Sequence, residues 1–146
     1  MTTEFLISDL KQDEGLRTES YQDTLGNWTW GYGHKDNHLG PGMHILPQAA
    51  YTLLLSDIST TKTAMDGIPS LRFWRTLDDL RQDVLVNMAF NLGAHALSTF
   101  TQFIAFVAAG QYAQAADDEL HTLWARQVGG RRAVRLSDQM RTGVHV

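Results

Sequence analysis

Two carboxylic acids and a threonine near the N-terminus have the side chains that glycoside hydrolysis requires. Glu14 and Asp23 lie nine positions apart, and Thr29 follows Asp23 by six positions. Cleavage of a glycosidic bond uses one carboxylic acid to protonate the leaving oxygen and a second carboxylate to act as nucleophile or to activate water. A threonine hydroxyl donates and accepts hydrogen bonds, so Thr29 can hold that water beside Asp23. On spacing alone, a helix cap and a turn residue are commoner roles for such a pair of acids.

The surrounding sequence predicts a helix followed by a β-hairpin. Apolar residues at helical spacing predict a first helix that is capped by Thr2 or Thr3 and ends near Glu14, before a glycine. Residues 16–34 are rich in Tyr, Trp and Thr and interrupted by Gly, which predicts short strands joined by a turn at residues 25–27. A hairpin that folds back toward the helix end would bring Asp23 across a cleft from Glu14.

The rest of the chain is predicted to be a loop followed by helices. The loop covers residues 35–46, and helices are expected at 47–66, after a cap at Thr76 up to Gly93, at 100–109 behind a Ser98–Thr99 cap, at 112–127 and at 131–141. The helix at 100–109 has so many apolar residues that it is expected at the centre of the core. The fold class is therefore predicted to be α+β, mainly α. We expect one domain over residues 1–146, with a β-containing lobe at about 14–60 and a helical lobe at about 1–13 and 61–146.

Composition narrows the classes of function. A chain of 146 residues is long enough for one domain with a sizeable core. The absence of cysteine excludes disulfide scaffolds, thiolate metal sites and cysteine nucleophiles. The longest apolar run, residues 103–109, is far shorter than the ~20 residues of a membrane span, so no stable membrane insertion is expected. Residues 120–146 hold 5 basic and 1 acidic side chains, which favours a local anion site over a nucleic-acid interface.

Three stretches carry a family resemblance. The most specific reads Glu14-Gly-x-Arg17, Tyr21-x-Asp23 and Gly26-x-x-Thr29-x-Gly31-x-Gly33-His34. The others are Asn87 to Gly93 with Phe100, and Trp124 with Arg131-Arg132-Ala133. This pattern resembles the phage-type lysozymes, the endolysin muramidases of glycoside hydrolase family 24. The resemblance covers nearly the whole chain and implies a lysozyme-like fold with an active-site cleft between the two lobes.

The resemblance also implies a reaction and its residues. A muramidase hydrolyses the β-1,4 bond between N-acetylmuramic acid and N-acetylglucosamine in bacterial peptidoglycan. Glu14 would be the general acid, Asp23 the base or electrostatic stabiliser, and Thr29 the residue that positions water. The expected stereochemistry is inversion, with the carboxyl groups about 6.5–9.5 Å apart. The expected substrate contacts are Asn91, Tyr32 and Phe100, and the expected supporting residues are His34, Arg131 and Arg132.

Cofactors and partners follow from the same resemblance. No metal and no organic cofactor is implied, and the expected partner is bacterial peptidoglycan, with no nucleic acid. The N-terminus has no signal-peptide pattern. We therefore expect a monomer that accumulates in the host cytoplasm and reaches the periplasmic cell wall by holin-assisted release.

Several alternatives stay open at this point. A lytic transglycosylase would need only one acid/base residue, and a catalytically inactive wall-binding domain would keep the fold alone. His34, His38 and His44 with Asp36 form a weak candidate metal cluster, because a glycine-rich loop does not align them. Arg131 or Arg132 is a candidate partner for Glu14. The alternative is that both arginines lie on a solvated helix face. Asn87 is equally a sugar contact or a buried amide.

Overall fold

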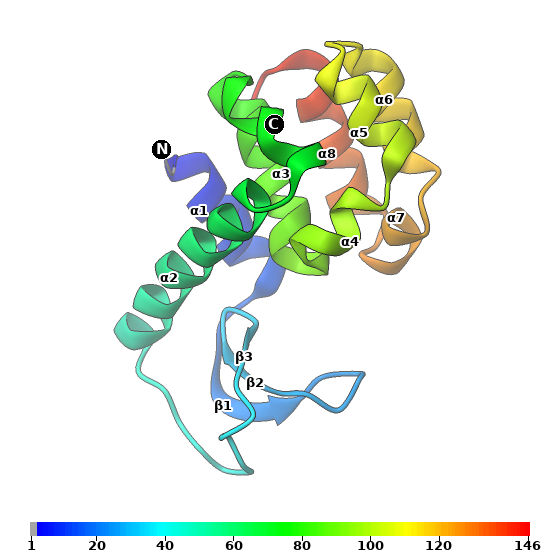
Figure 1. The fold of residues 1–146 in the computed structure, drawn as a ribbon. Coiled ribbons are helices and arrows are strands. Elements are labelled where there is room, and N and C mark those ends of the chain that lie inside the picture. Colours follow the sequence, from blue (N-terminus) through cyan, green and yellow to red (C-terminus); the bar gives the residue numbers. More distant parts are fainter. Residues whose placement is uncertain (1–2) are drawn as a thin grey trace. The chain divides into compact units, whose positions relative to one another are not determined.

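The computed structural model describes residues 3–146 and confirms the predicted α+β, mainly helical class (Figure 1). Its helices and strands, in chain order, are α1 Glu4–Glu14, β1 Arg17–Gln22, β2 Trp28–Gly31, β3 His34–Lys35, α2 Pro47–Asp66, the 3-10 helix η1 Pro69–Thr76, α3 Asp79–Leu92, α4 Ala94–Ser98, α5 Thr101–Ala108, α6 Tyr112–Leu120, α7 Leu123–Gln127 and α8 Gly130–Thr142. These elements belong to two compact units. The first unit is Ile7–Thr60. The second, which we call the helical unit, consists of the described residues before Ile7 together with Thr61–Val146.

The predicted first helix is confirmed at both ends. Thr3 caps α1, since its hydroxyl accepts a hydrogen bond from the N–H of Leu6 at 3.0 Å. The alternative cap, Thr2, lies outside the described residues. The helix ends at Glu14, where Gly15 adopts a φ of +69° and donates its N–H to the carbonyl of Lys11 at 3.0 Å. A glycine is favoured here because side chains are strained at positive φ.

The sheet of the first unit is antiparallel, in the order β1-β2-β3. Thr29 of β2 lies opposite Tyr21 of β1 and opposite Lys35 of β3. Residues that are directly opposite in an antiparallel pair place their side chains on the same face. The predicted hairpin is thus confirmed, and Thr29 and Lys35 share one face of the sheet.

The predicted loop after β3 is tied to β1 by one buried serine. The hydroxyl of Ser20 donates to the carbonyl of Gly40 at 2.6 Å and accepts from the N–H of Met43 at 3.0 Å. Backbone hydrogen bonds add to this, from Ser20 N–H to Met43 and from Ile45 N–H to Thr18, both 2.8 Å. These bonds satisfy backbone groups that the loop would otherwise leave unpaired.

The helical unit is built around α3. Residues 83–89 of α3 are buried, which makes α3 the central helix. α5 contributes only one face to the core, with Phe103, Ile104 and Val107 buried and four of its eight residues exposed, so its predicted central position is wrong. The fully buried large side chains of this unit are Leu6, Met65, Leu71, Trp74, Leu85, Met88, Leu97, Phe103 and Leu136. Burial of one such side chain stabilises the fold by roughly 1.5–3 kcal/mol. Among the described residues, no helix has the length and apolar character to cross a membrane.

The expected capping of α3 by Thr76 is wrong. The helix begins at Asp79, and its cap is Asp78, whose carboxylate accepts from the N–H of Arg81 at 3.2 Å. The 3-10 helix η1, which the sequence did not predict, extends to Thr76. The hydroxyl of Thr76 is therefore used at the end of η1, where it donates to the carbonyl of Phe73 at 2.6 Å.

The expected capping of α5 by Ser98 and Thr99 is also wrong. Their hydroxyls donate to the carbonyls of His95 and Ala96, so they end the unpredicted short helix α4. The residue that precedes α5 is Phe100, which makes no capping hydrogen bond with its side chain. The same two hydroxyls fit a helix end as well as a helix start, because serine and threonine bond to nearby backbone in both settings.

One helix over 112–127 was predicted, and the structure has two. α6 ends at Leu120 and α7 begins at Leu123. Thr122 separates them, since its hydroxyl donates to the carbonyl of Glu119 at 2.7 Å and accepts from the N–H of Ala125 at 3.2 Å. No glycine or proline marks this break, so the composition gave no stop signal. The final helix, predicted at 131–141, is confirmed as α8.

Candidate active site

Glu14 packs against the backbone of the β2–β3 turn. A Cβ atom added to Gly33 would lie 3.4 Å from both Cδ and Oε2 of Glu14. Gly33 also has a φ of +71°, a region that other residues rarely adopt. Glycine at this position therefore serves the tight turn, and the carboxyl group of Glu14 lies within contact distance of any side chain that replaced it.

Asp23 opens the turn between β1 and β2 and accepts several hydrogen bonds. Its Oδ1 accepts from the backbone N–H groups of Leu25 at 2.9 Å and of Asn27 at 2.8 Å. Its Oδ2 accepts from the side-chain amide of Asn27 at 3.3 Å and lies 3.7 Å from Nζ of Lys35. The turn thus holds the Asp23 carboxylate in a defined orientation.

These contacts favour the ionised form of Asp23. The backbone N–H of Asn27 lowers the pKa of Asp23 below its ordinary value of 3.8, against an opposing effect of burial. The side-chain amide of Asn27, the N–H of Leu25 and the ammonium of Lys35 lower the pKa further. Hydrogen bonds and positive charge next to a carboxylate stabilise its charged form. Asp23 is therefore suited to act as a base rather than as a proton donor.

Thr29 is buried in β2, with 2% of its surface exposed. Its hydroxyl donates to the backbone carbonyl of Asn27 at 3.0 Å. A hydroxyl has one hydrogen and two lone pairs, so this bond leaves the oxygen of Thr29 as an acceptor. Thr29 and Asp23 therefore share Asn27 as a hydrogen-bond partner at the two ends of the same turn.

His34 is held by α2 and not by other histidines. Its Nδ1 lies 2.8 Å from Oδ2 of Asp57, and both side chains are partly buried. His38 lies instead beside Asp36, at 3.1 Å, and is almost fully exposed. In the part of the chain that the structure describes, no three metal-binding side chains are grouped closely enough to hold an ion. Residues 34–44 thus contain separate pairs rather than a cluster.

Tyr32 is the expected sugar contact within the unit Ile7–Thr60, and its ring lies near a lysine. Nζ of Lys11 is 6.0 Å from the centre of the Tyr32 ring and 4.5 Å from the centre of the Tyr51 ring. The ring of Tyr32 is half-buried in the β2–β3 turn. Its role in substrate binding stays a prediction.

In the helical unit, Asn91 and Asn87 have different partners. Oδ1 of the exposed Asn91 accepts from the indole N–H of Trp124 at 2.8 Å. Oδ1 of the buried Asn87 accepts from the guanidinium of Arg132 at 2.8 and 3.1 Å. Asn87 thus has a side-chain partner that neither interpretation of the sequence included.

The remaining expected residues of this unit are Phe100, which is half-buried before α5, and Arg131, which is exposed. The contacts of Arg132 with Asn87 provide acceptors for Nε and Nη2 of its buried guanidinium. Pairing of either arginine with Glu14, and the roles of Asn91 and Phe100 in substrate binding, stay predictions.

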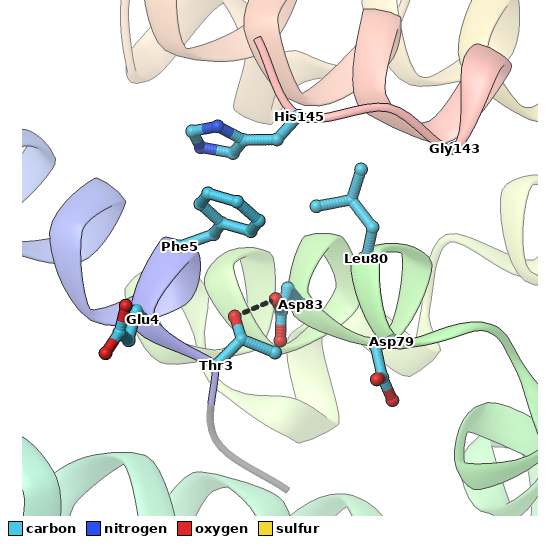
Figure 2. A pocket seen from close by; sticks show the side chains of 8 residues that line it. All are labelled: Thr3, Glu4, Phe5, Asp79, Leu80, Asp83, Gly143 and His145. Atoms are coloured by element: carbon cyan, nitrogen blue, oxygen red, sulfur yellow. Dashed lines mark hydrogen bonds between the residues drawn. The ribbon is translucent and has the colours of Figure 1, made fainter.

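The helical unit also contains a pocket of about 390 Å³ that none of the expected site residues lines (Figure 2). The ring of Phe5 stacks on that of His145 at 4.2 Å between ring centres, on one side of the pocket. The hydroxyl of Thr3 donates to the carboxylate of Asp83 on the other side. This contact joins the start of α1 to α3.

The residue that sequence reasoning missed in this site is Asn27. It lies in the predicted turn, but only the structure shows that it bonds to both Asp23 and Thr29. The sequence signal covers only part of this turn, because aspartate commonly accepts from the backbone N–H two residues further along, which is Leu25 and not Asn27. The approach of Lys35 to Asp23 depends on the β2–β3 register and had no comparable signal.

Comparison with known proteins agrees with the resemblance found in the sequence. Residues 11–140 match the family model described as Phage lysozyme. The chain is 28% identical over 157 aligned positions to "Probable T4-type lysozyme 2" of Dictyostelium discoideum, with 92% of each chain covered. "Probable T4-type lysozyme 1" of the same organism is 25% identical over 145 positions, which cover 84% of this chain and 85% of the relative. An "Endolysin" of Acyrthosiphon pisum secondary endosymbiont phage 1 is 33% identical over 92 positions, 63% of this chain and 60% of the relative.

Proposed function

Because the chain belongs to the phage lysozyme family, we propose that it is a muramidase that hydrolyses bacterial peptidoglycan. The bond cleaved is the β-1,4 linkage between N-acetylmuramic acid and N-acetylglucosamine. The observation that carries the proposal is the Asp23 carboxylate, held ionised in a turn whose other end presents the oxygen of Thr29. Relatives named lysozyme and endolysin support the same class of reaction.

The roles of the three residues follow from their chemistry. Glu14 donates a proton to the glycosidic oxygen as the bond to the anomeric carbon breaks. Asp23 accepts a proton from water as the oxygen of that water attacks the opposite side of the sugar, and Thr29 accepts a hydrogen bond from the same water. This single displacement inverts the configuration at the anomeric carbon. The reaction needs no metal or organic cofactor.

The decisive experiment combines a lysis assay with analysis of the products. Outer-membrane-permeabilised cells are treated with wild type, with Glu14→Gln and with Glu19→Gln, the same change at an exposed position of β1. General acid catalysis contributes about 10²–10⁴-fold, so Glu14→Gln is expected to lose at least that factor while Glu19→Gln keeps its activity. Normal lysis by a folded Glu14→Gln protein would rule out the proposed role of Glu14.

Mass spectrometry of the released muropeptides separates the alternatives. Hydrolysis adds water and leaves reducing sugars, whereas a lytic transglycosylase leaves anhydro sugars that are lighter by one water. Wild type is expected to release reducing sugars. Anhydro products would establish the transglycosylase, and binding to cell walls without products would establish an inactive wall-binding domain.

The stereochemistry tests Asp23 and Thr29 separately from Glu14. Proton NMR of a freshly cleaved oligosaccharide is expected to show the α-anomer first. Thr29→Val keeps the branched shape without the hydroxyl and should lower kcat more than it raises KM. A β-anomer as first product would make Asp23 a nucleophile and leave Thr29 without a role in catalysis.

We extend the proposal to the cellular setting on the basis of the endolysin relatives. The protein acts on the periplasmic cell wall as a monomer and is released from the host cytoplasm with the help of a holin. Its expression should lyse cells only when the inner membrane is permeabilised. Lysis by expression alone would show another route to the wall.

A further inference from the structure

Asn27 makes four hydrogen bonds that connect the two residues on which water activation depends. Its backbone N–H and its side-chain amide donate to the carboxylate of Asp23, at 2.8 and 3.3 Å. Its carbonyl accepts from the backbone N–H of Asp23 at 2.9 Å and from the hydroxyl of Thr29 at 3.0 Å. One residue therefore sets the orientation of both groups.

The bonds from Asn27 make the two oxygens of Asp23 different. Oδ1 accepts two backbone N–H groups, those of Leu25 and Asn27, which occupy its two lone-pair directions. Oδ2 accepts the Asn27 amide and lies 3.7 Å from the exposed ammonium of Lys35, which is beyond hydrogen-bond distance. Oδ2 therefore keeps one lone pair for a water molecule.

The carbonyl of Asn27 determines the direction of the Thr29 hydroxyl. Since the hydrogen of Thr29 is used in that bond, its oxygen only accepts from a water. A water that donates one hydrogen to Thr29 and the other to Oδ2 of Asp23 keeps both lone pairs, and one of them is free to attack carbon. In this arrangement its proton moves to Asp23 as the new carbon–oxygen bond forms.

We propose that Asn27 is a positioning residue that orients both Asp23 and Thr29 toward one attacking water. The inference rests on the proposed hydrolysis and adds to it a residue whose backbone holds both side chains and whose amide holds Oδ2 of Asp23, the one contact that requires asparagine at this position. Lys35 is the charged group that faces Asp23 from the neighbouring strand β3. It offsets part of any negative charge added at the turn.

The sharpest test is Asn27→Asp, which keeps the shape and replaces the amide donor by a second carboxylate. Two carboxylates that share a site raise one of their pKa values strongly. The acid limb of the kcat/KM profile on a soluble peptidoglycan oligosaccharide is expected to move up by about one pH unit or more. The matched control is Asn37→Asp, the same change at an exposed loop residue of the same unit, and its profile should follow that of wild type.

Asn27→Ala tests the donor without adding charge. It should lower kcat about 10- to 150-fold, as expected for loss of a hydrogen bond to a charged group, and leave KM unchanged. Circular dichroism establishes that each variant is folded. Carbon NMR titration of the Asp23 carboxyl measures its pKa directly, and that pKa should rise in both Asn27 variants.

The outcomes separate this inference from the proposed function. An active wild type whose Asn27 variants keep the wild-type kcat, pH profile and Asp23 titration would overturn the role of Asn27 alone. A folded wild type that cleaves no glycan would overturn the proposed function and the positioning role together. Reduced stability with an unchanged pH profile would make Asn27 a turn residue only.

Discussion

Glu119 is a carboxylic acid buried in the core of the helical unit. Only 1% of its surface is exposed, and neither of its carboxylate oxygens has a hydrogen-bond partner among the described residues. Burial, and to a smaller extent the charge of Asp138 on α8, raises the pKa of Glu119 from 4.5 to about 8. Removal of a carboxylate from water is unfavourable, so the folded protein holds Glu119 in its neutral form at neutral pH.

The pKa of Glu119 makes stability depend on pH. Between pH 4.5 and about 8 the folded chain keeps a proton on Glu119 that the unfolded chain has lost. The free energy of unfolding therefore falls as pH rises through this range, since the folded state binds more protons. One pKa unit corresponds to about 1.4 kcal/mol, so the loss is about 3 kcal/mol at pH 7 and about 4 kcal/mol at pH 8, and it approaches about 5 kcal/mol only above pH 8.

Glu119→Gln removes this penalty while it keeps the shape of the side chain. Urea unfolding at pH 5, 7 and 8.5 should give the variant a larger free energy of unfolding than wild type, and the difference should grow with pH. Asp118→Asn, which removes a less buried carboxylate from the adjacent position of α6, is the control and should show no such growth. Parallel stability curves for wild type and Glu119→Gln would refute the reasoning, because they would mean that Glu119 titrates alike in both states.

Three further predictions concern the packing, the ion pair and the helix cap, and each is tested by thermal or urea unfolding. Leu85→Ala should cost about 2–5 kcal/mol, because Leu85 is fully buried in α3 and its loss leaves a cavity. Asp57→Asn should cost about 1–2 kcal/mol by weakening the 2.8 Å contact with its histidine partner. Asp36→Asn should lower the free energy of unfolding by less, because its partner His38 is almost fully exposed. Asp78→Ala should cost about 1 kcal/mol, more than Thr76→Ala, because Asp78 is the cap of α3.

Helix ends were predictable where a glycine ends the helix. Gly15 and Gly93 follow α1 and α3, as the sequence predicted, because positive φ is available to glycine at little cost. The break between α6 and α7 was missed, since the hydroxyl of Thr122 is what satisfies the backbone there. A threonine inside a helical pattern does not by itself indicate whether its side chain bonds to the backbone.

Side-chain pairs were predictable only when they are local. Asp23 and Asn27 belong to one turn, and the turn itself was expected from its composition. The contact of Arg132 with Asn87 joins residues 45 positions apart, and it depends on how α8 packs against α3. Neither residue type nor spacing selects such a partner, because many polar side chains compete for it until the helices are placed.

The burial of Glu119 had a weak signal of its own. It follows two aspartates, and a run of three acids is typical of a solvated helix face. Yet Glu119 lies four residues after Ala115, on the same side of α6, and Ala115 is fully buried. The helical period thus predicts a core position for Glu119, whereas the charge of its neighbours predicts a solvated position.

Asp23 and Glu119 are the same chemical group in opposite environments. Donors in the β1–β2 turn stabilise the charged form of Asp23 and keep its pKa below 3.8, whereas burial stabilises the neutral form of Glu119 up to about pH 8. Under the proposed mechanism, activity is therefore limited in acid by protonation of Asp23 and in alkali by loss of the proton that Glu14 donates, whereas ionisation of Glu119 lowers the stability of the fold. Glu119→Gln should thus keep the chain folded to higher pH without moving either limb of the kcat/KM profile of the folded enzyme, because Glu14 and Asp23 determine those limbs.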